Sequence, residues 1–161
     1  MKRITLVLLA AVVCLCASAR SRADDNPLLG KWKLNVEKSK FTPATTAPKS
    51  QTRTVEADGD SVKYSFEVVS TEGKAGSYGF AVKYDGKFYA ITGSGAPYGA
   101  DEISIKRVTA HSYNATLKRG GKEVATSRLV VSKDGKTATL NGKGTDASGN
   151  KLSSTSIYDK E

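Results

Sequence analysis

Apolar and polar residues alternate along most of the chain in short runs. The run 61–69 shows the pattern best, because its apolar residues occupy every second position: Val62, Tyr64, Phe66 and Val68. A period of two is typical of β-strands that bury one face, and no longer window shows the period of an amphipathic helix. The pattern predicts ten strands: 29–36, 51–57, 61–69, 77–84, 87–92, 101–108, 112–118, 122–132, 136–144 and 151–159.

Turn signals between the runs indicate how the strands connect. Three Asp-Gly pairs each separate two alternating runs, a pattern that favours tight hairpins: Asp58-Gly59, Asp85-Gly86 and Asp134-Gly135. Short connections between successive antiparallel strands produce an up-and-down meander, and a long meander hides its edges by closing on itself. The sequence therefore predicts an all-β fold, an antiparallel meander of eight to ten strands closed into a barrel. An open sandwich is the alternative.

Two of the predicted strands are too polar to line a dry interior. The run 136–144 alternates Thr and Asn with small residues, and the run 151–159 consists mostly of Ser and Thr. We therefore expect either a partly polar, hydrated lumen or a barrel with one weakly packed wall.

The N-terminus has the features of an export signal. Two basic residues precede an apolar run over 4–16, and small residues offer a cleavage site after Ala19 or after Ala23. The run is shorter than the roughly 20 apolar residues that a membrane-spanning helix needs. We expect residues 1–23 to be a signal peptide, residues 24–161 to form a single β-barrel domain, and the product to be secreted or periplasmic.

Removal of that segment changes the charge and the cysteine content. The whole chain has a formal net charge of +9, but four of its basic residues and both cysteines, Cys14 and Cys16, lie within residues 1–23. The mature chain is then mildly basic and has no disulfide. Its basic residues are scattered instead of forming a stripe with stacking aromatics, so we expect no nucleic-acid partner. His111 is the one histidine of the chain, and we expect no metal site, no cofactor, no stable membrane insertion after cleavage, and a monomer.

The start of the first predicted strand carries a motif, Gly30-x-Trp32, within the apolar segment 28–34. This segment resembles the opening strand of the lipocalins and fatty-acid-binding proteins, the calycin superfamily. The chain is also similar in its overall pattern to small exported lipocalin-like proteins of bacteria. The resemblance implies a barrel in which Trp32 closes one end and Gly30 lets the strand bend. A barrel of ten strands is wide enough to hold a small molecule.

The chain departs from the fatty-acid-binding proteins at two places. Those proteins hold a carboxylate with an Arg-x-Tyr pair on the last strand, where this chain has Ser156-x-Tyr158. Their helix-turn-helix lid follows the first strand, but residues 41–51 of this chain are rich in Pro, Thr and Ser and do not favour helices. The resemblance therefore implies a ligand-binding barrel without that particular carboxylate site.

Five residues are candidates for contacting a ligand. Arg53, Arg107 and Arg128 each share a strand face with apolar residues. If those faces point inward, each guanidinium enters the lumen and needs an anion, from the protein or from a ligand. The alternative is that bulges turn the arginines outward or that nearby carboxylates pair with them. Tyr64 and Tyr158 each offer an apolar ring and a hydroxyl to a cavity.

These features favour a binding protein over an enzyme. The adjacent carboxylates of Asp101 and Glu102 point to opposite faces of a strand and cannot act on one substrate. We expect an exported, non-enzymatic lipocalin-like protein that binds a small amphipathic or anionic molecule in its lumen. The alternative is an exported protein-interaction or inhibitor module with a filled barrel. Such a module would use the barrel rim and the Gly-rich loop 93–99, whose aromatic tip we expect to be exposed.

Overall fold

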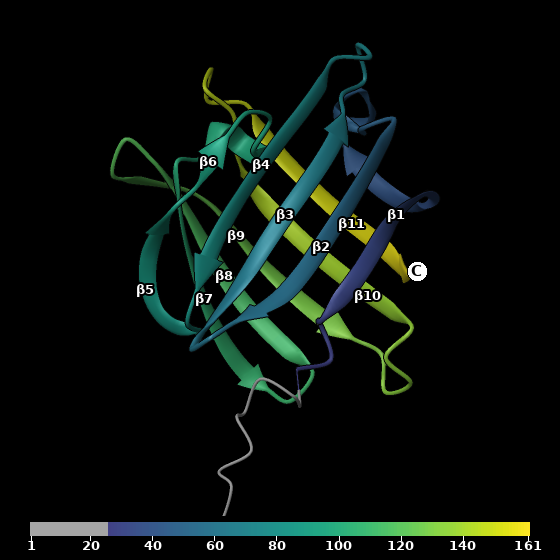
Figure 1. Cartoon of the computed structure of the whole chain (residues 1–161). Helices are drawn as coiled ribbons and strands as arrows, with labels where there is room; N and C mark the ends of the chain where they lie inside the picture. Colours follow the sequence, from purple (N-terminus) through teal and green to yellow (C-terminus); the bar gives the residue numbers. More distant parts are fainter. Residues whose placement is uncertain (1–25) are drawn as a thin grey trace, which may run out of the picture.

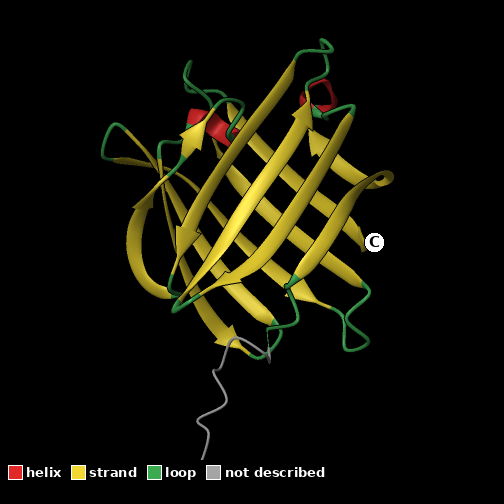
Figure 2. Ribbon diagram, viewed as in Figure 1, coloured by secondary structure: helices red, strands yellow, loops and turns green. Residues whose placement is uncertain are grey.

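The computed structural model describes residues 26–161, so the predicted signal peptide at 1–23 lies outside the described residues. Strands dominate, and the two helices are short 3-10 turns, η1 (Ala44–Thr46) and η2 (Pro97–Gly99) (Figure 2). No helix within residues 26–161 has the length and apolarity needed to cross a membrane. The strands are β1 (Gly30–Thr42), β2 (Ser50–Asp58), β3 (Ser61–Val69), β4 (Ala75–Val82), β5 (Asp85–Ala90), β6 (Thr92–Gly93), β7 (Glu102–Thr109), β8 (Ser112–Arg119), β9 (Lys122–Val131), β10 (Thr137–Thr145) and β11 (Lys151–Lys160).

The strands form one antiparallel sheet that curls into a nearly closed barrel (Figure 1). Their order is β5-β7-β8-β9-β10-β11-β1-β2-β3-β4-β6. The first and last strands of the described residues meet in this sheet, because β1 pairs with β11, with Trp32 opposite Lys160 and Leu34 opposite Tyr158. The predicted antiparallel barrel is confirmed, and its first and last strands lie side by side.

The seam of the barrel lies between β4 and β5. β5 pairs with β7 and β6 pairs with β4, so the chain over 85–93 passes from one edge of the sheet to the other. The hairpin predicted at Asp85-Gly86 is therefore wrong, since β4 and β5 do not pair in the described sheet. Tyr84 adopts a φ of 53°, and a bulge follows between Asp85 and Phe88. These irregularities bend the chain sharply at this point. The single strand predicted over 87–92 is divided into β5 and β6, so the described chain has eleven strands.

β1 continues beyond its predicted end at residue 36. Its pairing with β11 is interrupted by a bulge between Asn35 and Lys40. Ser39 holds this bulge in place, because its Oγ donates to the carbonyl oxygen of Asn35 at 2.6 Å and accepts from the N–H of Ile157 at 2.9 Å. The alternation of side chains is lost inside the bulge, which is why the sequence pattern does not reveal the second half of the strand.

The barrel is plugged at the end where β1 begins, which we term the closed end. Trp32 is fully buried, and its indole Nε1 donates to the carbonyl oxygen of Leu28 at 2.8 Å. Gly30 has a φ of 116°, and a Cβ at this position would lie 2.9 Å from Cε of Lys160. Glycine therefore allows both the left-handed backbone and the close approach that bring the chain into β1 at this end.

Candidate functional site in the barrel lumen

A cavity of about 400 Å³ occupies the lumen, within the range of about 300–1,000 Å³ that is typical of small-molecule sites. It extends from Leu28 at the closed end to Pro48, Thr71 and Pro97 in the connections at the opposite end, which we term the mouth. Its lining is mainly apolar, with several serines, and Arg53 is the one charged residue among the described residues that line it.

Arg53 projects from β2 into this cavity. The residue is 3% exposed, and its guanidinium carbon lies 4.4 Å from the ring centroid of Tyr158 and 5.9 Å from that of Trp32. Its Nε and Nη2 are buried and have no hydrogen-bond partner within residues 26–161. Two aromatic rings thus hold the cation in place, while two of its nitrogens are left without an acceptor.

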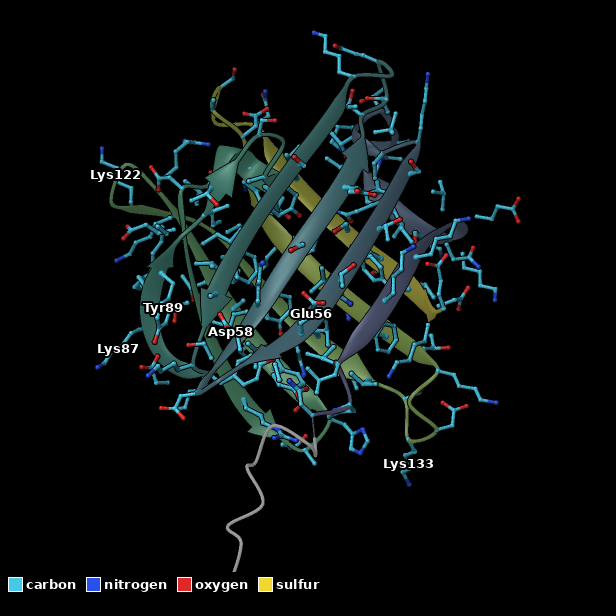
Figure 3. The ribbon with its side chains drawn as sticks, in the orientation of Figure 1. Glu56, Asp58, Lys87, Tyr89, Lys122 and Lys133 are labelled. Carbon is cyan, nitrogen blue, oxygen red and sulfur yellow. The ribbon has the colours of Figure 1, made fainter. Side chains whose placement is uncertain are left out.

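The inward position of Arg53 follows from the register of the sheet. Arg53 pairs with Trp32 on β1 and with Phe66 on β3, and all three residues are buried. Side chains of one strand alternate between the two faces, so Glu56 on the same strand lies on the outer surface (Figure 3). Lys87, in β5, and Lys133, in the β9–β10 turn, also lie outside (Figure 3). Arg53 therefore points into the lumen, away from these surface charges.

Tyr158, another predicted site residue, lies beside Arg53 in a hydrogen-bonded group. Its hydroxyl donates to Oε1 of Gln51 at 2.6 Å, and Nε2 of Gln51 donates to the hydroxyl of Tyr78 at 3.1 Å. Burial raises the pKa of both tyrosines, and the nearby charge of Arg53 opposes that rise. Both hydroxyls are therefore protonated at neutral pH and available as neutral polar groups in the cavity lining.

Tyr64 lines the cavity and also belongs to a hydrogen-bonded network at the closed end. Its hydroxyl lies 2.6 Å from that of Tyr84, which accepts from Nδ2 of Asn26 at 3.0 Å. Oδ1 of Asn26 accepts from the hydroxyl of Tyr113 and from the backbone N–H of Leu28, both at 3.0 Å. Burial raises the pKa of Tyr64 well above its usual value and that of Tyr113 to about 12. The network links the start of the described chain to the closed end of the barrel.

Arg107 pairs with Tyr113 at the closed end but does not enter the cavity, so its predicted place among the ligand contacts is wrong. Its Nε donates to the carbonyl oxygen of Thr109 at 3.3 Å and its Nη2 donates to that of Ala110 at 2.9 Å. Its guanidinium carbon lies 5.7 Å from the ring centroid of Tyr113, and Arg107 does not line the cavity. Arg107 is the last regularly paired residue before the bulge at the end of β7, and its side chain turns toward the carbonyl oxygens of the β7–β8 turn.

The predicted inward position of Arg128 is also wrong. Arg128 is exposed on the outer face of β9, while Ala125 and Leu129 face the core. β9 carries apolar residues on both faces, including Val130, which is 38% exposed. A register shift beside Leu117 changes which residues of β9 face the core. For this reason the apolar residues along the sequence indicate the wrong face of β9 for Arg128.

The loop 93–99 folds over the mouth of the barrel. Tyr98 at its tip is half-buried and lines the cavity, so the prediction of an exposed aromatic tip is wrong. Its backbone is left-handed, with φ 59° and ψ 11°. Arg119 holds it there, because Nη1 donates to the carbonyl oxygen of Tyr98 at 2.6 Å and Nη2 donates to that of Asp146 at 3.1 Å. The loop is a lid on the cavity, joined to the β8–β9 and β10–β11 turns.

Sequence reasoning missed several lining residues, most clearly Gln51 and Tyr78. Tyr78 shares a strand face with Phe80, so the alternation along β4 was the signal that could have placed it in the lumen. Gln51 shares a face with Arg53, but a glutamine at a strand end carries no such signal by itself. Its role depends on Tyr158 and Tyr78, which reach it from two other strands.

Solved structures include barrels of the same kind. The S-type phycobiliprotein lyase CPES from Guillardia theta matches with a TM-score of 0.54 and 10% identity, over 86% of this chain and 90% of that chain. An ileal bile acid-binding protein from zebrafish, complexed with cholic acid, matches with a TM-score of 0.48 and 11% identity, over 84% and 99% of the two chains. A redesigned β-barrel, mFAP1, bound to DFHBI, matches with a TM-score of 0.45 and 13% identity, over 87% and 100%.

Comparison with protein-family models and with curated proteins finds no match. At the identity to the lyase, the likeness is one of fold. This chain and the lyase share an antiparallel β-barrel fold, and in this chain the barrel encloses a mainly apolar cavity with a buried arginine.

Proposed function

We propose that this chain is an exported, non-enzymatic binding protein that holds one small amphipathic molecule in its lumen, with an anionic group of that molecule on Arg53. The observation that carries the proposal is the pair of buried guanidinium nitrogens that lack an acceptor within residues 26–161. A charge removed from water is costly unless a counter-charge or hydrogen bonds compensate. A carboxylate or sulfonate accepts two parallel hydrogen bonds from a guanidinium and would supply both.

The rest of the lining suits the other end of such a molecule. Apolar side chains from both halves of the barrel surround the cavity, which favours the hydrocarbon part of an amphipathic ligand. The tyrosine hydroxyls and serines near Arg53 add neutral polar groups that can orient a head group. A hollow of this size supports a ligand site and speaks against the alternative of an interaction module with a filled barrel.

The absence of catalytic activity is part of the proposal. Asp101 and Glu102 do not line the cavity, and Asp101 accepts from the N–H of Gly120 at 2.8 Å. The described residues that line the cavity include no carboxylate and no histidine that could act as a general base. Export rests on the basic start and the apolar run over 4–16. N-terminal sequencing of the product from the native host should show a chain that begins after Ala19 or Ala23.

Titration of the mature protein with anilinonaphthalene sulfonate, a fluorescent amphipathic anion, tests lumen binding. We expect saturable binding at one site, and Arg53→Met should weaken it by about tenfold to a hundredfold, the loss of a charge-assisted hydrogen bond. Arg128→Met is the matched control, because that arginine lies on the outer face, and it should leave the affinity unchanged. Equal affinities of the wild-type protein and the Arg53→Met variant would refute the role of Arg53.

A further inference from the structure

The wall of the lumen beside Arg53 is built from four aromatic rings on β3 and β4. They form two cross-strand pairs, Phe66 with Tyr78 and Tyr64 with Phe80. The ring centroids of the first pair are 4.4 Å apart and the planes differ by 7°, while those of the second are 4.9 Å apart and differ by 26°. We refer to these four residues as the aromatic wall.

The aromatic wall presents ring edges to the cavity. The centroid distances within the two cross-strand pairs are close to the spacing of about 4.8 Å between neighbouring strands. The rings therefore stack along the direction in which the strands pair. Rings stacked in that direction stand upright on the sheet, with their edges toward the lumen. The edge of an aromatic ring is electropositive, whereas its face is electronegative. Arg53 pairs with Phe66 in the same row, so the cation lies beside the electropositive ring edges.

The opposite wall is lined by a row of small residues. Ala115 on β8 pairs with Ser127 on β9, Ser127 pairs with Gly142 on β10, and Gly142 pairs with Ser154 on β11. All four line the cavity. β9, β10 and β11 lie across the barrel from β3 and β4 (Figure 1). We refer to these four residues as the small-residue row.

The aromatic wall and the small-residue row, with Tyr98 at the mouth, bound the space that we refer to as the slot. Upright rings project into the lumen on one side. The row across the barrel has side chains of one or two heavy atoms, or none, and the side chain of Tyr98 reaches it from the lid, since a Cβ at Gly142 would lie 3.1 Å from the Tyr98 hydroxyl. Leu129 and Leu140 continue this wall on β9 and β10. A flat body that lies along the slot touches the ring edges with its face, which is the edge-to-face arrangement that aromatic groups prefer. A saturated chain of the same size has no electron-rich face and gains no such contact.

Resting on the proposed function, we infer that the ligand is a planar, conjugated anion whose π-face lies against the aromatic wall and whose anionic group reaches Arg53. Ala115 and Ser127 of the small-residue row leave room for the planar body, and Tyr98 bounds that room where it lies against Gly142. The specificity of the lumen then has two independent parts, charge at Arg53 and flatness in the slot.

Calorimetric titration with three probes separates these two parts. Anthracene carboxylate is planar and anionic, myristate is a saturated carboxylate with a similar number of non-hydrogen atoms, and anthracene methanol is planar and neutral. We expect the mature protein to bind anthracene carboxylate at least about tenfold more tightly than either of the others. Equal or tighter binding of myristate that is lost in Arg53→Met would overturn the planar ligand and leave the proposed function standing. Failure of both carboxylates to bind would overturn the proposed function itself.

Variants in each wall test whether the slot provides this preference. Phe66→Leu should weaken the binding of anthracene carboxylate about tenfold and leave that of myristate within about twofold. Phe88→Leu, on β5 and outside the cavity lining, is the matched control and should change neither. Ser127→Val narrows the slot from the other side and should have the same selective effect if Phe66→Leu does not fold. Equal losses for the two carboxylates in a folded wall variant would contradict the inference.

Discussion

The closed end and the lumen around Arg53 both bury polar groups, but they differ in the hydrogen-bond partners that they supply to those groups. At the closed end, Asn26 joins the hydroxyls of Tyr84 and Tyr113 and the N–H of Leu28. In the lumen, two nitrogens of Arg53 are buried without an acceptor within residues 26–161. Buried polar groups in folded proteins are hydrogen-bonded with few exceptions. The closed end follows this rule and stabilises the barrel, whereas the exception at Arg53 indicates where a partner from outside the chain would bind.

Alkaline pH should have the largest effect, because it acts on both regions at once. Burial raises the pKa of Tyr64 at the closed end and of Tyr78 and Tyr158 in the lumen above the usual value. Between its unfolded and folded pKa, each such group is ionised only in the unfolded chain. The free energy of unfolding should therefore fall as the pH rises above about 10, by about 1.4 kcal/mol per pH unit for each group.

Urea unfolding at a series of alkaline pH values, followed by circular dichroism, measures this fall. Tyrosinate absorbance recorded on the same samples should appear together with unfolding. Tyrosinate that forms near pH 10 in a protein that is still folded would contradict the burial of these hydroxyls.

Trp32→Ala should have the largest effect among single substitutions. The substitution removes a fully buried indole at the closed end and its hydrogen bond to Leu28, which should lower the free energy of unfolding by about 3–5 kcal/mol. Trp32→Phe keeps a ring in the plug and should cost less. A loss below 1 kcal/mol for Trp32→Ala, measured by urea unfolding, would mean that the closed end does not depend on this plug.

Arg53→Met should change stability in the opposite direction. Methionine fills the space between the Trp32 and Tyr158 rings without a buried charge, so the ligand-free protein should gain about 1–3 kcal/mol after the loss of the cation–π contacts. Urea unfolding of protein freed of ligand measures the gain. A variant that is less stable than the wild-type protein would show that Arg53 has a structural role instead of serving a ligand.

Asn26→Ala tests the closed end, where the buried polar groups have hydrogen-bond partners. It leaves the hydroxyls of Tyr84 and Tyr113 with one partner fewer and should cost about 1–3 kcal/mol. Asn114→Ala, on the outer face of β8, is the matched control and should stay within about 0.5 kcal/mol of the wild-type protein. Both substitutions remove an asparagine side-chain amide. Equal changes in the free energy of unfolding, measured with urea, would therefore contradict the importance of the closed-end network.

The sequence predicts most of the barrel because strand periodicity is a local property. Alternation along 61–69 and the Asp58-Gly59 turn specify β3 and its hairpin directly. The seam at Asp85 and the bulge at Ser39 escape prediction, since both depend on contacts with other strands that a local pattern does not contain. The same limit explains the site. Arg53 lies on a strand with one clear apolar face, whereas Arg107 lies at the closed end beyond the cavity and Arg128 lies on the outer face of β9.

The smallest change in stability is expected at the lid, where function should change instead. Tyr98→Gly relieves a left-handed backbone that tyrosine rarely adopts and removes a half-buried ring. These effects oppose each other, so the free energy of unfolding should change by less than about 1 kcal/mol. Without the ring over the mouth, a bound anion should dissociate several times faster in stopped-flow displacement. Arg119→Gln, which releases the same loop, should also speed dissociation, whereas Tyr98→Phe keeps the ring and should not. Unchanged dissociation in both loop variants would mean that the ligand leaves the lumen by another route, with the seam between β4 and β5 as the next place to test.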